Sequence, residues 1–133
     1  MKTISRRFHP GSDVRRSLET LSKEEKINAA VVLGAVGSLS KVCLRFANRD
    51  NPTEMIGKHE ILTLSGMLST EGVHIHASVS NAKGQCVGGH VAYGCEVYTT
   101  LEIAIALLPN TQFHRTVDPN TGFKELFVSA SNE

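Results

Sequence analysis

The sequence predicts an α+β fold, in which a curved, mostly antiparallel sheet of about seven strands is flanked by one or more helices. Three observations favour this class. One amphipathic helical pattern lies near the N-terminus, and a series of segments with the strand period of two follows it. The turns between the later segments are too short for helical crossovers, which favours antiparallel pairing. No linker or repeat divides residues 1–133, so we expect a single domain.

The helical segment begins near Asp13. Either Ser12 or Asp13 can accept hydrogen bonds from the unpaired N–H groups of a first helical turn. Three apolar residues then recur at helical spacing among charged neighbours: Val14, Leu18 and Leu21. We therefore expect a surface helix with one buried stripe. Ser22 and Glu25 also fit a capping box, which leaves a break in the helix as an alternative.

Strand patterns fill most of the remaining chain. Residues 29–39 are apolar and β-branched and contain Gly34 and Gly37, so they predict a buried strand followed by a turn. Residues 48–58 are polar, contain a proline and predict a loop. Further strands are expected in these segments: 41–48, 59–69, 72–80, 85–94, 96–109, 112–118 and 124–130. Turn sequences at 81–84 and 119–122 separate the last pairs of strands.

The composition narrows the classes of function. The net charge of +1 disfavours a protein built mainly to bind phosphate backbones. Four N-terminal arginines form either a solvated surface or a local anion-binding patch: Arg6, Arg7, Arg15 and Arg16. Three cysteines without a C-x-x-C motif disfavour a disulfide framework, and no secretory signal or membrane-spanning run occurs. We therefore expect a cytoplasmic protein without a membrane partner.

Three of the six histidines lie within residues 74–90. In the strand 72–80, His74 and His76 share the polar face because side chains alternate along a strand. If residues 81–85 form a five-residue loop, Ser80 pairs with Cys86 and His76 lies opposite His90. The three imidazoles then converge and can bind a zinc-like ion with a fourth position open. A slip of one residue would turn His90 away, so histidines scattered over a hairpin remain the alternative.

Gly88 and Gly89 precede His90 and fit the same arrangement. They remove two side chains and leave room for an ion or for a second backbone, although they could also mark a simple kink in a curved sheet.

Other polar residues are weaker candidates. Glu60 is a candidate general base or carboxylate ligand, but it also fits a charge at a strand edge. Cys86 shares the His90 face, yet we expect it to be a small buried residue, and Cys95 has no stronger claim as a ligand. Glu102 lies at a subunit contact or faces solvent. Three other histidines do not fit a metal-binding motif with one another and are expected to be structural or exposed: His9, His59 and His114.

Several motifs occur in an order that resembles a known family. The segments "PGSDV", "VVLGAVGSL", "GKHEILTLSG", "HIHASVSNAKG", "GGHVAYGCEVYTTLEI" and "FKELFV" are similar to the PPC (plant and prokaryote conserved) domain, over about residues 3–128. In plants this domain follows an AT-hook in DNA-binding proteins. The chain resembles the stand-alone prokaryotic type, which implies a curved antiparallel sheet, a homotrimer, and a metal site, commonly zinc, at His74, His76 and His90.

The chain departs from the family pattern at three points. It has no R-G-R-P core of an AT-hook, which weakens the case for DNA binding. Asn81 stands where the family often has an aspartate, which weakens any role for a carboxylate at the turn. His59 stands where an aromatic residue often precedes the Glu60 position, and it adds an imidazole there.

Three functions remain as expectations. The first is a metal-binding homotrimer, with zinc at His74, His76 and His90 and a reaction or ligand that the sequence does not name. The second is a DNA-binding or DNA-associated regulatory protein. The third is a structural trimerisation or partner-docking module, with the apolar strand 102–109 at a subunit interface. Whether the protein is an enzyme stays open.

Overall fold

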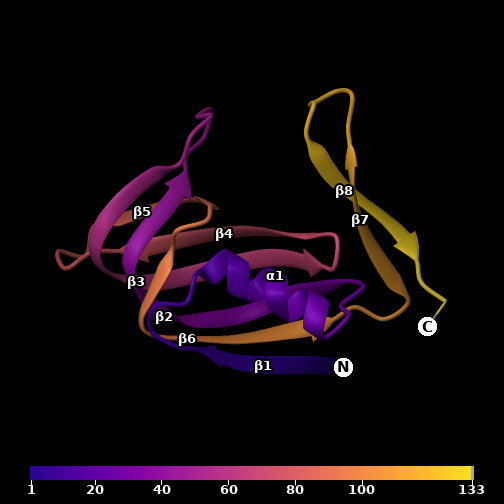
Figure 1. The fold of residues 1–133 in the computed structure, drawn as a ribbon, viewed down its shortest axis with the longest axis horizontal. Helices are drawn as coiled ribbons and strands as arrows, with labels where there is room; N and C mark the ends of the chain where they lie inside the picture. Colours follow the sequence, from indigo (N-terminus) through magenta and orange to yellow (C-terminus); the bar gives the residue numbers. More distant parts are fainter. Residues whose placement is uncertain (133) are drawn as a thin grey trace.

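The structure is a computed structural model that describes residues 1–132 (Figure 1). Within them it has one helix and eight strands, mostly antiparallel, which confirms the predicted α+β class. The elements are β1 (Lys2–Phe8), α1 (Val14–Glu24), β2 (Ala30–Arg45), β3 (Thr53–Ser69), β4 (Gly72–Ser80), β5 (Cys86–Val91), β6 (Glu96–Leu107), β7 (Thr111–Val117) and β8 (Lys124–Ala130).

Six strands form the main sheet in the order β1-β6-β2-β3-β4-β5. The long strand β2 pairs with β6 on one side and β3 on the other, and its C-terminal end also pairs with β5. This additional pairing closes β2, β3, β4 and β5 into a ring, while β6 and β1 extend it. The inner face carries an aliphatic core from every one of these strands except β1. Fully buried members include Leu44, Leu68, Ile75, Val79, Leu101 and Ile105.

Helix α1 begins where the sequence predicts. Asp13 is its N-cap, since Oδ1 accepts a hydrogen bond of 3.0 Å from the N–H of Arg16, and Oδ2 accepts one of 2.7 Å from the N–H of Gly94. The predicted stripe is buried: Val14, Leu18 and Leu21. The helix does not break at Ser22, whose hydroxyl donates to the Leu18 carbonyl. No helix within residues 1–132 is long and apolar enough to cross a membrane.

The structure corrects three local expectations. Lys2–Phe8 is a strand that the sequence analysis did not predict, and it covers the free edge of β6. Residues 53–58, expected in a loop, belong to β3. Gly37 does not make a turn but lies inside the continuous strand β2. A Cβ atom there would lie 2.2 Å from the carbonyl oxygen of Thr100 in β6, so the glycine allows close packing of two backbones.

Strands β7 and β8 form a separate two-stranded sheet that projects from the body (Figure 1). Its base is held by His114, whose ring nitrogens lie 2.7 Å from Glu71 Oε2 and 2.9 Å from Ser129 Oγ. Much of the hairpin's apolar surface is exposed: Val117, Phe123, Leu126, Phe127 and Val128. The hairpin is joined to the body at its base, by His114 at the turn between β3 and β4 and by the buried Phe113, whose N–H donates to the Asn28 carbonyl oxygen.

Candidate metal centre

The predicted hairpin register is present. Ser80 pairs with Cys86 and His76 with His90, across a loop of residues 81–85. Asn81 organises this loop, because its side-chain oxygen accepts hydrogen bonds of 2.9 Å and 3.0 Å from the N–H groups of Lys83 and Gln85. Asn81, which stands where the family often has an aspartate, therefore uses its side-chain oxygen in hydrogen bonds within the turn.

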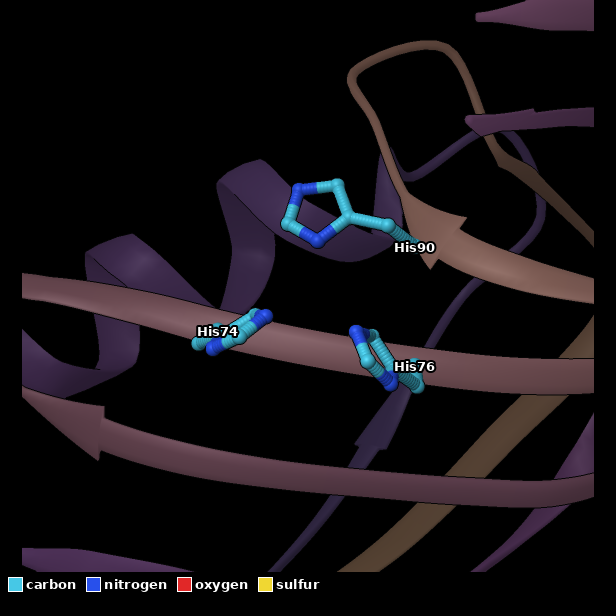
Figure 2. Close-up of side chains that lie close together, drawn as sticks. All are labelled: His74, His76 and His90. Carbon is cyan, nitrogen blue, oxygen red and sulfur yellow. The ribbon is translucent and has the colours of Figure 1, made fainter. Parts of the chain in front are cut away.

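The three imidazoles converge as the register requires (Figure 2). His74 and His76 come from β4 and His90 comes from β5, and one ring nitrogen of each lies within 4.8 Å of the others. The ring centroids are 4.9 Å apart for His74 and His76, 5.2 Å for His74 and His90, and 5.7 Å for His76 and His90. Ligands on one tetrahedral zinc ion lie about 3.3 Å apart, so the three nitrogens would have to move closer together to hold one ion.

His90 provides the test of whether these residues fit a metal ion. Its Nδ1 atom is buried and has no hydrogen-bond partner within residues 1–132. A buried nitrogen without a partner costs free energy, which a bound cation would recover. Burial lowers the pKa of His90 to about 4, and the charge of Arg45 adds to the effect. The imidazole is therefore neutral near pH 7, as a metal ligand must be.

His74 has the same tendency. Its pKa is lowered by burial first and then by the charges of His76 and Arg115. Three imidazoles, with no carboxylate among them, are a donor set that suits zinc and other late transition metals. The residues thus fit the predicted ion.

The two glycines before His90 make room for backbone. A Cβ atom at Gly89 would lie 2.8 Å from the carbonyl oxygen of Arg45 in β2, and one at Gly88 would lie 3.0 Å from that of Ala77 in β4. Of the two purposes expected for them, the structure supports the close approach of a second backbone. Because β5 lies tightly between β2 and β4, the position of His90 is fixed by both neighbours.

Glu60 is not brought to the imidazoles. It is exposed on β3 opposite Ser80, which is four residues from His76 and therefore about 13 Å away along β4. Its role as a general base stays a prediction. His59 lies next to Glu60 in β3 and is not part of the histidine cluster. Its Nδ1 atom lies 2.9 Å from the carbonyl oxygen of Gly57.

The cysteines divide into one exposed thiol and one buried pair. Cys86 is exposed, which corrects the expectation that it is buried. Cys43 and Cys95 are buried and free, and the Cys95 thiol donates to the Cys43 carbonyl oxygen at 3.2 Å. Burial raises the pKa of Cys95 to about 11, so this thiol is not a thiolate ligand at neutral pH. None of the three joins the histidine cluster.

The other candidates lie outside the histidine cluster. His9 contacts the Arg7 guanidinium, and His114 anchors the β7–β8 hairpin. Glu102 is exposed on β6, opposite Arg7 of β1, and accepts a hydrogen bond from the Thr100 hydroxyl. Sequence reasoning missed the arginines near the histidines, of which Arg45 lies directly opposite His90. Arg45 and His90 become neighbours through the pairing of β2 with β5, and no local sequence pattern predicts that pairing.

Known proteins resemble this chain in sequence and in structure. The pattern of the Plants and Prokaryotes Conserved (PCC) domain matches residues 1–109, which end before the β7–β8 hairpin. The bifunctional protein GlmU of a Synechococcus strain is 43% identical over 128 residues, which are 96% of this chain and 20% of GlmU. The chain thus spans about a fifth of the length of that relative.

Two solved structures share the fold over nearly their whole length. A hypothetical protein from Salmonella is 36% identical with a TM-score of 0.93, and the match covers 97% of this chain and 94% of that one. A protein from Archaeoglobus fulgidus, described as metal-containing, is 26% identical with a TM-score of 0.83, and the match covers 96% and 94% of the two chains.

Proposed function

Because the chain belongs to the family of the Plants and Prokaryotes Conserved domain, we propose that it is a metal-binding homotrimer that holds zinc at His74, His76 and His90. The observation that carries the proposal is the convergence of three imidazoles around the buried, unpartnered Nδ1 of His90. The resemblance to a metal-containing protein from Archaeoglobus fulgidus supports it.

The chain's own residues prepare this site in two ways. Burial, the largest effect, and nearby positive charges lower the pKa values of His74 and His90, which favours the neutral forms that bind a cation. The strands on both sides of β5 fix the direction of His90 before any ion arrives. A zinc ion with three protein ligands keeps a fourth position for water or another ligand, and it lowers the pKa of bound water to about 7.

The trimer is proposed from the resemblance to the family and from exposed apolar surface. Ile103 and Ile105 of β6 face the chain's own core, where both are buried. We therefore place the subunit contact on other residues. Large apolar side chains are exposed on β2 and β3 of the main sheet: Leu33, Val36, Ile56, Leu62 and Met67. Sedimentation analysis tests the proposed trimer, because a monomeric mass at micromolar concentration would contradict it.

Metal analysis of the purified protein tests the central proposal. We expect about one equivalent of zinc per chain after dialysis against limiting zinc, and loss of that zinc in a His90→Ala variant. A His59→Ala variant is the matched control, because His59 is another half-buried strand histidine outside the cluster. Equal zinc content in the two variants would refute the site.

DNA binding is the second candidate, and it has less support. The net charge is +1, and the only helix within residues 1–132 contributes buried residues to the core on one face. A DNA-binding domain would show affinity that falls steeply as salt rises. Absence of binding to duplex DNA at low salt would remove this candidate.

A structural trimerisation or docking module is the third candidate. In that case a metal would serve as an incidental or structural clip. Replacing His74, His76 and His90 together by alanine separates the possibilities: a triple variant that keeps its oligomeric mass, its melting temperature and its ligand binding would make the metal incidental.

A further inference from the structure

Arg45 of β2 lies beside the histidines, in line with His76 of β4 and His90 of β5 across three neighbouring strands. It lies directly opposite His90 in the β2–β5 pair, and His90 lies opposite His76 in the β4–β5 pair. Residues directly opposite each other point to the same face of a sheet. Arg45 is half-buried, and its charge lowers the pKa of His90. One of its five N–H donors forms a long bond of 3.5 Å to the carbonyl of Arg49, which leaves others for a ligand.

Arg15 lies in the first turn of α1, which is hydrogen-bonded to the segment that follows β5. Figure 2 shows this helix behind His74 and His90, and α1 packs against β4. The guanidinium of Arg15 stacks on the ring of Tyr93 at 4.4 Å, and the Tyr93 hydroxyl donates to Glu19 at 2.8 Å. The arginine is therefore held in place by its stacking partner.

Arg15 also has an unsatisfied donor. Its Nε atom is buried and has no hydrogen-bond partner within residues 1–132, and the other side-chain atom in this condition there is Nδ1 of His90. Tyr93, on which Arg15 stacks, follows His90 by three residues, and the N–H of Val14, the residue before Arg15, donates to the Cys95 carbonyl oxygen, so Arg15 lies close to the end of β5. One unsatisfied nitrogen thus lies on His90 in β5, and the other lies on an arginine packed against the segment that follows β5. A cation can satisfy only His90, because a guanidinium donates and cannot ligate a metal.

Arg115 adds a third charge from the projecting hairpin. A Cβ atom at Gly72, two residues before His74 on the same face of β4, would lie 3.9 Å from Cγ of Arg115. The contact of His114 Nδ1 with Glu71 Oε2, at 2.7 Å, holds β7 at this position. The charge of Arg115 lowers the pKa of His74, and the charge of Glu125 on β8 raises it. Three arginines from three elements, Arg15, Arg45 and Arg115, therefore lie on residues that pair with or neighbour the histidine strands.

We propose that the histidine site binds a small oxyanion, a carboxylate or phosphate group, which is held between the metal's open position and the guanidinium groups of Arg15 and Arg45. The inference rests on the proposed metal site and names the class of its ligand. Guanidinium groups match planar carboxylates and phosphates with paired N–H donors. Arg115, on the hairpin, contributes long-range attraction and contacts the part of the ligand that projects from the site.

Titration of the cobalt-loaded full chain tests the inference, since the visible spectrum of cobalt(II) reports a change of ligand at the metal. The probes are sodium acetate and inorganic phosphate at constant ionic strength, and they separate the two sources of the oxyanion. We expect a saturable spectral change with at least one probe. In Arg45→Gln and Arg15→Gln variants the dissociation constant of that probe should rise by about tenfold or more.

Arg7→Gln is the matched control. It removes the same charge from β1, the edge strand that pairs with β6 and with none of β2 to β5. Cobalt content and the far-ultraviolet spectrum are measured for each variant. Loaded wild-type protein that binds neither probe, or arginine variants that bind as tightly as the control, would overturn the inference while leaving the metal site intact. Failure of the wild-type chain to take up cobalt or zinc would overturn the proposed function and this inference with it.

Discussion

Gly89 is the position where a single methyl group should damage both the fold and the metal site. In a Gly89→Ala variant the new Cβ atom would lie 2.8 Å from the carbonyl oxygen of Arg45 and 3.4 Å from the Leu44 Cβ atom. An ordinary contact needs about 3.4 Å, so β5 must retreat from β2 by roughly half an ångström. Because the obstacle is backbone in the middle of a sheet, relief is costly, and we expect a loss of about 1–3 kcal/mol in the free energy of unfolding.

The same retreat moves His90, the next residue. Metal–ligand distances tolerate only about 0.2 Å, so zinc affinity should fall by about tenfold or more, as it does when the supports of a ligand are altered. Chemical denaturation of the metal-free chain measures the first effect, and competition with a chromogenic chelator measures the second. Gly34→Ala is the control, because nothing lies within 4 Å of its Cβ position. If the two variants have equal stability and equal zinc affinity, the packing argument is wrong.

Three other predictions concern thiols, protons and the hairpin. A thiol reagent at pH 8 should modify Cys86 rapidly and Cys95 only on unfolding, because Cys95 is buried and its pKa is raised to about 11; equal rates in mass spectrometry would contradict this. For the metal-free protein, the free energy of unfolding should fall as the pH drops from about 6.5 to about 4, because the unfolded chain binds a proton that folded His90 does not; an equally steep profile in a His90→Gln variant would contradict this origin. Finally, His114→Ala should raise amide exchange in residues 111–130 by removing the contact with Glu71, and unchanged exchange there would exclude the anchoring role.

The histidine hairpin could be predicted because its geometry is local. Strand parity fixes the faces of His74 and His76, and the length of one short loop fixes the partner of His76. The pairing with His90 needed no information from the rest of the chain, and the structure confirms it.

Features that depend on distant pairing could not be predicted in this way. Lys2–Phe8 is mostly exposed and lacks an alternating apolar pattern, and it is a strand because the edge of β6 accepts it. Gly37 resembles a turn residue in sequence, but the approach of β6 is what requires it. The meeting of Arg45 with His90 depends on the closure of β2 onto β5, for which no local signal exists.

The position of all three histidines within one hairpin has a consequence for the order of events in folding. A β-hairpin forms within about 1–10 μs, so the complete ligand set can assemble while the rest of the chain is still searching for its pairings. Metal captured at that stage would stabilise β4 and β5 as a nucleus on which β2 and β3 close. Arg15 and Arg45 arrive only with that closure, and the chain would therefore acquire its metal early and its affinity for anions last.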